Sequence, residues 1–151
     1  NSPFDLMHAN LRGKTIIQST RAGTVGVTNV SGADVIYGGS LAVAGATARA
    51  IASHKPEKVS LVAMGLEGKV KADEDEQCAL YLRNLLQGRR PDKDSVRALI
   101  LAGEESQKYD DPSLPQWPPE DRMMALDIDS HNFALRIARE DDLFVARPEY
   151  V

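Results

Sequence analysis

The sequence has no apolar run long enough to cross a bilayer and no signal-peptide pattern at its start. Its single cysteine, Cys78, excludes an internal disulfide and any zinc site built from several cysteines. Basic clusters are equally scarce, and Arg89-Arg90 is too short to form a basic face. We therefore expect a cytoplasmic protein that neither enters a membrane nor binds nucleic acid.

The bulk composition is that of a folded chain. Of the 151 residues, 42% are hydrophobic and 26% are charged, which is close to the average for globular proteins. The formal net charge of -4 also argues against nucleic acid as the main partner. The length predicts one α/β domain over residues 1–151. Because the chain begins with Asn1 and not Met, we expect it to be processed, cut or the C-terminal part of a longer product.

Short apolar runs alternate with helical patterns along the chain. The apolar runs predict strands at 14–18, 34–37, 59–64 and 143–146. Amphipathic spacing and capping residues predict helices at 41–54, 73–88, 94–104 and 120–126. Strands and helices in alternation are typical of a three-layer α/β/α fold with a mostly parallel sheet.

Three loops of small residues follow the first three expected strands, at 19–24, 38–40 and 65–68. In an open parallel sheet, ligands bind beside the carboxyl ends of the strands. We therefore expect the three loops to share one rim.

The loop at 19–24 offers donors for an anion. Its hydroxyls belong to Ser19, Thr20 and Thr24, Gly23 lets backbone N–H groups approach closely, and Arg21 can form a charge-assisted contact. The alternative is an ordinary turn whose hydroxyls only cap the next helix.

Two further clusters carry weaker signals. The acidic residues 73–76 can hold Mg²⁺, but the pattern alone favours a solvated first helical turn. Asp127-Ile-Asp129-Ser130-His131 suggests metal or acid–base chemistry, although Asp-x-Asp pairs are common by chance. Cys78 near a helix start is more often a small core residue than a nucleophile.

Taken together, these segments resemble the 2-phosphosulfolactate phosphatase family, whose members are Mg²⁺-dependent. The resemblance follows the chain in order: Asn1-Ser2-Pro3, the stretch from Arg12 to Thr24, Gly39-Ser40, Ala63-Met-Gly65 with Gly68, Glu74-Asp-Glu-Gln-Cys78, Ser130-His131 and Asp142-Leu143. Arg21 and Ala22 stand where the family commonly has Thr and Asn, and Leu66 replaces a Thr.

The resemblance implies Mg²⁺-assisted hydrolysis of a phosphate monoester on a small acid such as 2-phosphosulfolactate. It implies Asp75 and His131 as catalytic residues, and Glu74 and Asp75 as metal ligands. The implied substrate-binding residues are Asn1, Ser2, Ser19, Thr20, Arg21, Gly23, Thr24 and Ser40.

Family members also carry a portion before Asn-Ser-Pro that is expected to contribute to the active site, so the chain's own N-terminal portion is an expected partner. A homodimer would be an ordinary assembly. Two other functions stay open: an anion-binding module without turnover, and a structural portion of a larger α/β protein.

Overall fold

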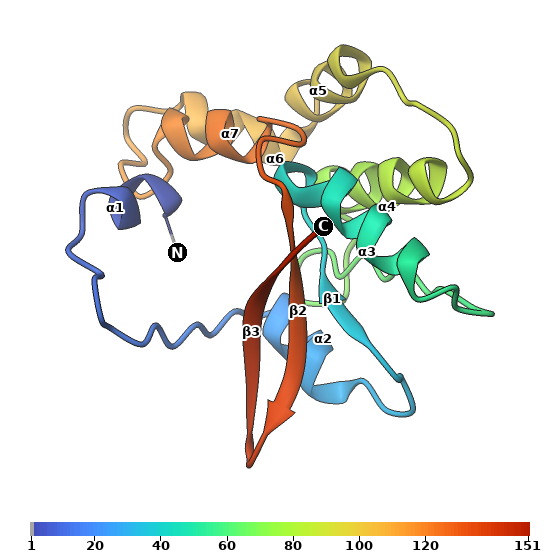
Figure 1. Cartoon of the computed structure of the whole chain (residues 1–151). Helices are drawn as coiled ribbons and strands as arrows, with labels where there is room; N and C mark the ends of the chain where they lie inside the picture. Colours follow the sequence, from blue (N-terminus) through green and yellow to red (C-terminus); the bar gives the residue numbers. More distant parts are fainter. Residues whose placement is uncertain (1) are drawn as a thin grey trace.

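The computed structural model describes residues 2–151, and Figure 1 shows the whole chain. Asn1, predicted to bind substrate, lies outside the described residues. The elements in chain order are α1 (Pro3–Met7), α2 (Gly23–Asn29), β1 (Ile36–Gly38), the 3-10 turn η1 (Leu41–Val43), α3 (Ala44–Ser53), α4 (Asp73–Leu86), α5 (Lys93–Leu101), α6 (Glu104–Gln107), η2 (Lys108–Asp110), α7 (Pro119–Ala125), β2 (Phe133–Glu140) and β3 (Leu143–Tyr150).

The sheet corrects the predicted architecture. It has three strands in the order β1-β2-β3, and both neighbouring pairs are antiparallel. Tyr37 of β1 lies opposite Arg136 of β2, while β2 and β3 form a hairpin around Asp141 and Asp142. The prediction of a three-layer α/β/α fold with a mostly parallel sheet was therefore wrong.

The error comes from two apolar segments that form no strand. Residues 14–18 and 59–64 belong to no helix or strand, and no strand of the described residues pairs with them. Several of their apolar side chains are left in solvent, since Ile17 is 93% exposed and Val62 is 70% exposed, while Leu61 packs against the core. An apolar run favours an extended backbone, but only a pairing partner converts that backbone into a strand.

The predicted helices are close to those observed. Asp92 caps α5 by accepting a hydrogen bond from the Ser95 amide at 2.8 Å. Four carboxylates occupy the first turn of α4, where the helix dipole favours negative charge. In α3, alternate small residues such as Ala46 and Ala50 are fully buried, which lets this helix pack closely against both α4 and β2.

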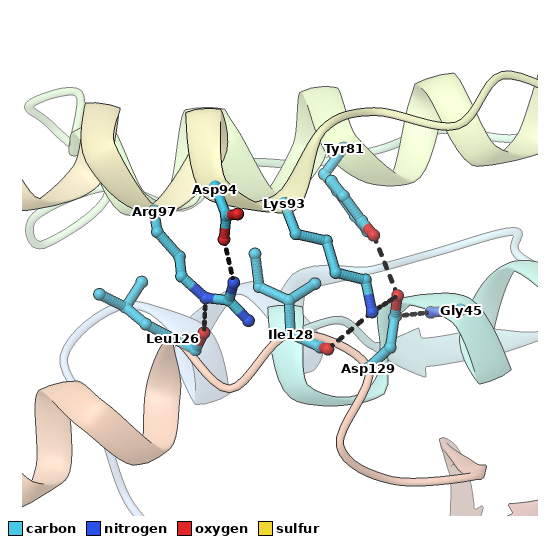
Figure 2. A network of polar contacts seen from close by, with 8 residues as sticks. All are labelled: Gly45, Tyr81, Lys93, Asp94, Arg97, Leu126, Ile128 and Asp129. Atoms are coloured by element: carbon cyan, nitrogen blue, oxygen red, sulfur yellow. Dashed lines mark hydrogen bonds and ion pairs between the residues drawn. The ribbon is translucent and has the colours of Figure 1, made fainter.

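The core lies where α4, α5, the start of α3 and the segment after α7 meet. Its buried members are Leu41, Ala44, Tyr81, Leu82, Val96, Ile100, Leu126 and Ile128. The segment at 126–131 thus connects the helical core to strand β2, and it carries the Asp129 contacts described below (Figures 1 and 2).

Candidate functional site

The predicted anion loop is closed by its own hydroxyls. The Thr24 amide donates to Thr20 Oγ1 at 3.0 Å, and the Thr20 amide donates to Thr24 Oγ1 at 2.9 Å. Thr24 Oγ1 also donates to the Thr20 carbonyl at 2.9 Å. Thr20 therefore accepts the amide of the second residue of α2, while the N-cap residue Ala22 has no side-chain cap bond and Ser19 remains exposed.

Arg21 joins this loop to the glycine turn at 65–68. Its guanidinium lies 2.9 Å from Glu67 Oε1, and the arginine side chain is 80% exposed. A second contact supports the same junction, because a Cβ placed on Gly26 of α2 would lie 2.5 Å from the Met64 sulfur. Helix α2 thus packs directly on the segment that enters the turn.

The glycine turn has a conformation that requires glycine at its first position. Gly65 has φ of +63°, and a Cβ there would lie 2.1 Å from the Val70 carbonyl oxygen. The turn closes when the Leu66 amide donates to that same carbonyl at 2.8 Å.

Asp75 holds the other side of this turn. The Gly65 amide donates to Asp75 Oδ2 at 2.7 Å. Residues 2–151 provide no further hydrogen bond and no cationic partner for this carboxylate. The 19–24 loop and Asp75 therefore both contact this turn, and Asp75 keeps an oxygen available.

Cys78, one turn after Asp75, packs against the hydrophobic core. Burial, followed by the negative charge of Asp75, raises the pKa of the Cys78 thiol to about 12. The thiol is therefore protonated at neutral pH and is a poor nucleophile.

The other predicted site residues lie in different surroundings. Ser2 donates to Asp121 Oδ1 at 2.8 Å and caps α1, and Ser40 precedes η1 without a side-chain cap bond. Glu74 is exposed on α4. The ring of His131 stacks on Phe133 and lines a cavity of about 390 Å³ that includes neither Asp75 nor the 19–24 loop.

A polar network missed by the sequence interpretation surrounds Asp129 (Figure 2). Asp129 Oδ1 accepts from the Gly45 amide at 2.6 Å, and Oδ2 accepts from the Tyr81 hydroxyl at 2.9 Å. Lys93 lies 3.0 Å from Oδ2 and also donates to the Ile128 carbonyl at 3.0 Å. The sequence pattern relates Asp129 only to Asp127, because Gly45, Tyr81 and Lys93 are remote from it along the chain.

The environment of Asp129 favours its charged form. Burial alone would raise its pKa, but the hydrogen bonds from Lys93, Gly45 and Tyr81 outweigh burial and hold the pKa below the ordinary value. The same bond to Asp129, after burial, raises the pKa of Tyr81 to about 12.

The described residues contain neither a cluster of metal-binding side chains nor a helix suited to a membrane. Within residues 2–151, no group of three or more His, Cys, Asp or Glu side chains is arranged to hold a metal ion. No helix in that same part of the chain has both the length and the apolar character that a membrane span needs.

Comparison with known proteins decides the family. The family model described as 2-phosphosulpholactate phosphatase matches residues 1–118, which is more than half of the chain. The chain belongs to this family. No curated protein and no solved structure gives a significant match. The 2-phosphosulpholactate phosphatase match includes the 19–24 loop, the glycine turn and Asp75, whereas Asp129 and His131 lie beyond it.

Membership of a phosphatase family supports a phosphatase enzyme. Of the predicted site residues, the structure brings Arg21 and Asp75 to the same turn and leaves Ser2 and His131 in other contacts. The glycine turn itself, through Gly65 and Glu67, was not among the predicted site residues. Its signal in the sequence was the Gly-x-x-Gly spacing.

Proposed function

We propose that this chain forms the phosphate-binding side of a Mg²⁺-dependent phosphatase acting on a monoester of a small acid such as 2-phosphosulfolactate. One observation carries the proposal: the 19–24 loop and Asp75 are both bound to the turn at 65–68, by contacts of 2.9 and 2.7 Å. The family match covers all three segments.

Arg21 is suited to bind the acid group of the substrate. Its ion pair with Glu67 is largely exposed, and such pairs contribute only about 0–1 kcal/mol. A substrate phosphate or sulfonate can therefore replace Glu67 at little cost. The exposed Ser19 hydroxyl and the Gly23 backbone lie in the same loop and would add neutral donors.

Asp75 fits the role of a magnesium ligand. Mg²⁺ is commonly bound by one or two carboxylates together with waters and substrate phosphate, and Asp75 has an oxygen without a hydrogen bond. Glu74 would be the second ligand only if it faced the same turn, and no contact joins it to that turn. When bound, the ion would polarise the phosphoryl oxygens and neutralise charge that develops on them.

In the proposed reaction, the oxygen of a water molecule forms a bond to phosphorus while the ester P–O bond breaks. The leaving oxygen takes a proton, giving an alcohol and inorganic phosphate. The donors of the 19–24 loop stabilise the negative charge of the transition state. His131 receives no step here, because it stacks on Phe133 and lines a cavity that does not include Asp75.

The test compares phosphate release from 2-phosphosulfolactate and an aryl phosphate, with Mg²⁺ and with EDTA. Asp75→Asn keeps an acceptor for the Gly65 amide but removes the charge, so we expect kcat/KM to fall by about 100-fold. Glu76→Gln is the matched control, because Glu76 is an exposed carboxylate of the same helical turn. Equal rates for wild type and Asp75→Asn would contradict the assignment.

A structural observation favours a second candidate, a portion of a larger assembly. The extended segments at 14–18 and 59–64 expose apolar side chains and have no strand partner within residues 2–151. We propose that strands from an N-terminal portion, or from a second copy in a homodimer, pair with them. Activity that appears only after such a portion is added would support this arrangement, and light scattering would identify a dimer.

A further inference from the structure

A cleft separate from the proposed phosphatase site lies between helices α3 and α4. Its volume is about 440 Å³, within the range of about 300–1,000 Å³ typical of small-molecule sites. Apolar side chains of α3 and α4 form its walls, and the connection between α4 and α5 contributes Arg90 and Pro91. The apolar lining consists of Ala48, Ala52, Leu85, Leu86 and Pro91.

The charges at this cleft are unbalanced. Three cations line it, Arg49, Arg90 and Lys93, against the single carboxylate of Asp129. That carboxylate is already used, because Lys93, Tyr81 and the Gly45 amide occupy its two oxygens (Figure 2). Positive charge therefore gathers here on a chain whose net charge is -4.

Arg49 and Arg90 are the cations left for a ligand. Neither forms an ion pair within 4.0 Å or a side-chain hydrogen bond with any residue in the range 2–151. Arg49 also lines the adjoining cavity beside Ser130 and Asn132, so its guanidinium lies at the junction of the two spaces. Gly45 keeps that junction open, since a Cβ there would lie 2.9 Å from Asp129 Oδ1 and 3.4 Å from Arg49 Nη1.

We infer that this cleft binds a small organic anion, with its phosphate, phosphonate or carboxylate head between Arg49 and Arg90. Its short apolar body would lie against Ala48, Ala52 and Leu85. Guanidinium groups recognise such oxyanions through charge-assisted hydrogen bonds, and an apolar wall favours a ligand that is not fully hydrophilic. The site shares no residue with the 19–24 loop, the glycine turn or Asp75, so it does not depend on the proposed function.

The test uses phenylphosphonate, whose C–P bond a phosphatase does not hydrolyse, in EDTA so that a metal-dependent site stays silent. Calorimetry should show binding to wild type and about tenfold weaker binding to Arg49→Gln and to Arg90→Gln. Arg83→Gln is the matched control, because Arg83 is an exposed arginine of α4 outside the cleft. It should bind like wild type.

A second variant tests the apolar wall. Ala52→Leu fills the cleft, so it should weaken the binding of phenylphosphonate at least fivefold while leaving the binding of inorganic phosphate unchanged. Amide shifts in NMR spectra should fall on Gly45, Ala48 and Ala52. The inference is overturned if wild type shows no binding at millimolar phenylphosphonate, if both arginine variants bind as tightly as wild type, or if the shifts fall on residues 19–24 and 65.

Discussion

Asp75 and Asp129 each accept a hydrogen bond from a glycine amide, at 2.7 and 2.6 Å, but they differ in their other partners. Asp129 also receives the Tyr81 hydroxyl and the Lys93 ammonium, and it ties α3, α4 and α5 to the segment before β2. Asp75 has the glycine amide alone. A carboxylate whose acceptors are all occupied stabilises a fold, whereas one with a free oxygen can bind a ligand.

The surroundings of the two aspartates differ in the same way. No residue of 2–40 or 51–71 is buried, and these stretches include the 19–24 loop and the glycine turn. Buried residues begin with Leu41 and continue through α3, α4 and α5. The 19–24 loop and the glycine turn thus lie on stretches without a buried residue, which is common for binding loops held by a scaffold.

Replacing Asp129 should have the largest effect on stability. Asp129→Ala leaves the hydroxyl of Tyr81, a residue only 2% exposed, without its partner and places alanine at φ of +61°. We expect the free energy of unfolding to fall by about 3 kcal/mol in urea denaturation, since an unsatisfied buried group costs about 1–3 kcal/mol and two more bonds are lost. Asp75→Ala, which loses one bond, should lose about 1 kcal/mol. Equal losses would remove the distinction between the two aspartates.

The glycine turn provides a second comparison with a built-in control. Gly65 and Gly68 both have positive φ, but only at Gly65 would a Cβ overlap a backbone oxygen. Gly65→Ala should cost about 2 kcal/mol from strain and overlap, and Gly68→Ala about 1 kcal/mol from strain alone. Gly65→Ala should also abolish phosphatase activity by displacing the turn from Asp75. Indistinguishable melting curves would show that the turn adapts freely.

The sequence allowed α3, α4, α5 and α7 to be predicted because their signals are local, whereas the short helices α1, α2 and α6 were not predicted. The acidic run at 73–76 marks the start of α4, and the alanine-rich stretch at 41–54 favours the helix observed as α3. The start of α5 was predicted at Asp94, whereas the structure places its N-cap at Asp92. The sheet was predicted wrongly because apolar runs indicate extension but not the partner. Strand β2 was missed although the larger apolar residues Phe133, Leu135 and Ile137 occupy every second position.

The candidate site shows the same limit. The 19–24 loop and Asp75 carried motif signals. Asp129 carried only a weak Asp-x-Asp signal, which suggested metal or acid–base chemistry and not the observed network. Its partners Gly45 and Tyr81 are 84 and 48 residues away, so no spacing rule connects them. The Arg49–Arg90 cleft was missed for this reason too, because only the packing of α3 on α4 places the two arginines around one space.

The smallest expected effect is a pH dependence confined to Asp129. Because its folded pKa lies below the ordinary 3.8, its charge stabilises the fold above that value, and the contribution is lost as pH falls through the folded pKa. We expect the free energy of unfolding of wild type to exceed that of Asp129→Asn by about 1 kcal/mol at pH 7. The expected difference is this small because Lys93 is 43% exposed, so solvent screens the ion pair. The difference should shrink as the pH falls below 3.8, measured by urea unfolding at each pH. Glu76→Gln should track wild type throughout. A difference that does not shrink as the pH falls below 3.8 would mean that the Asp129 charge contributes nothing, and that its hydrogen-bond geometry alone separates it from Asp75.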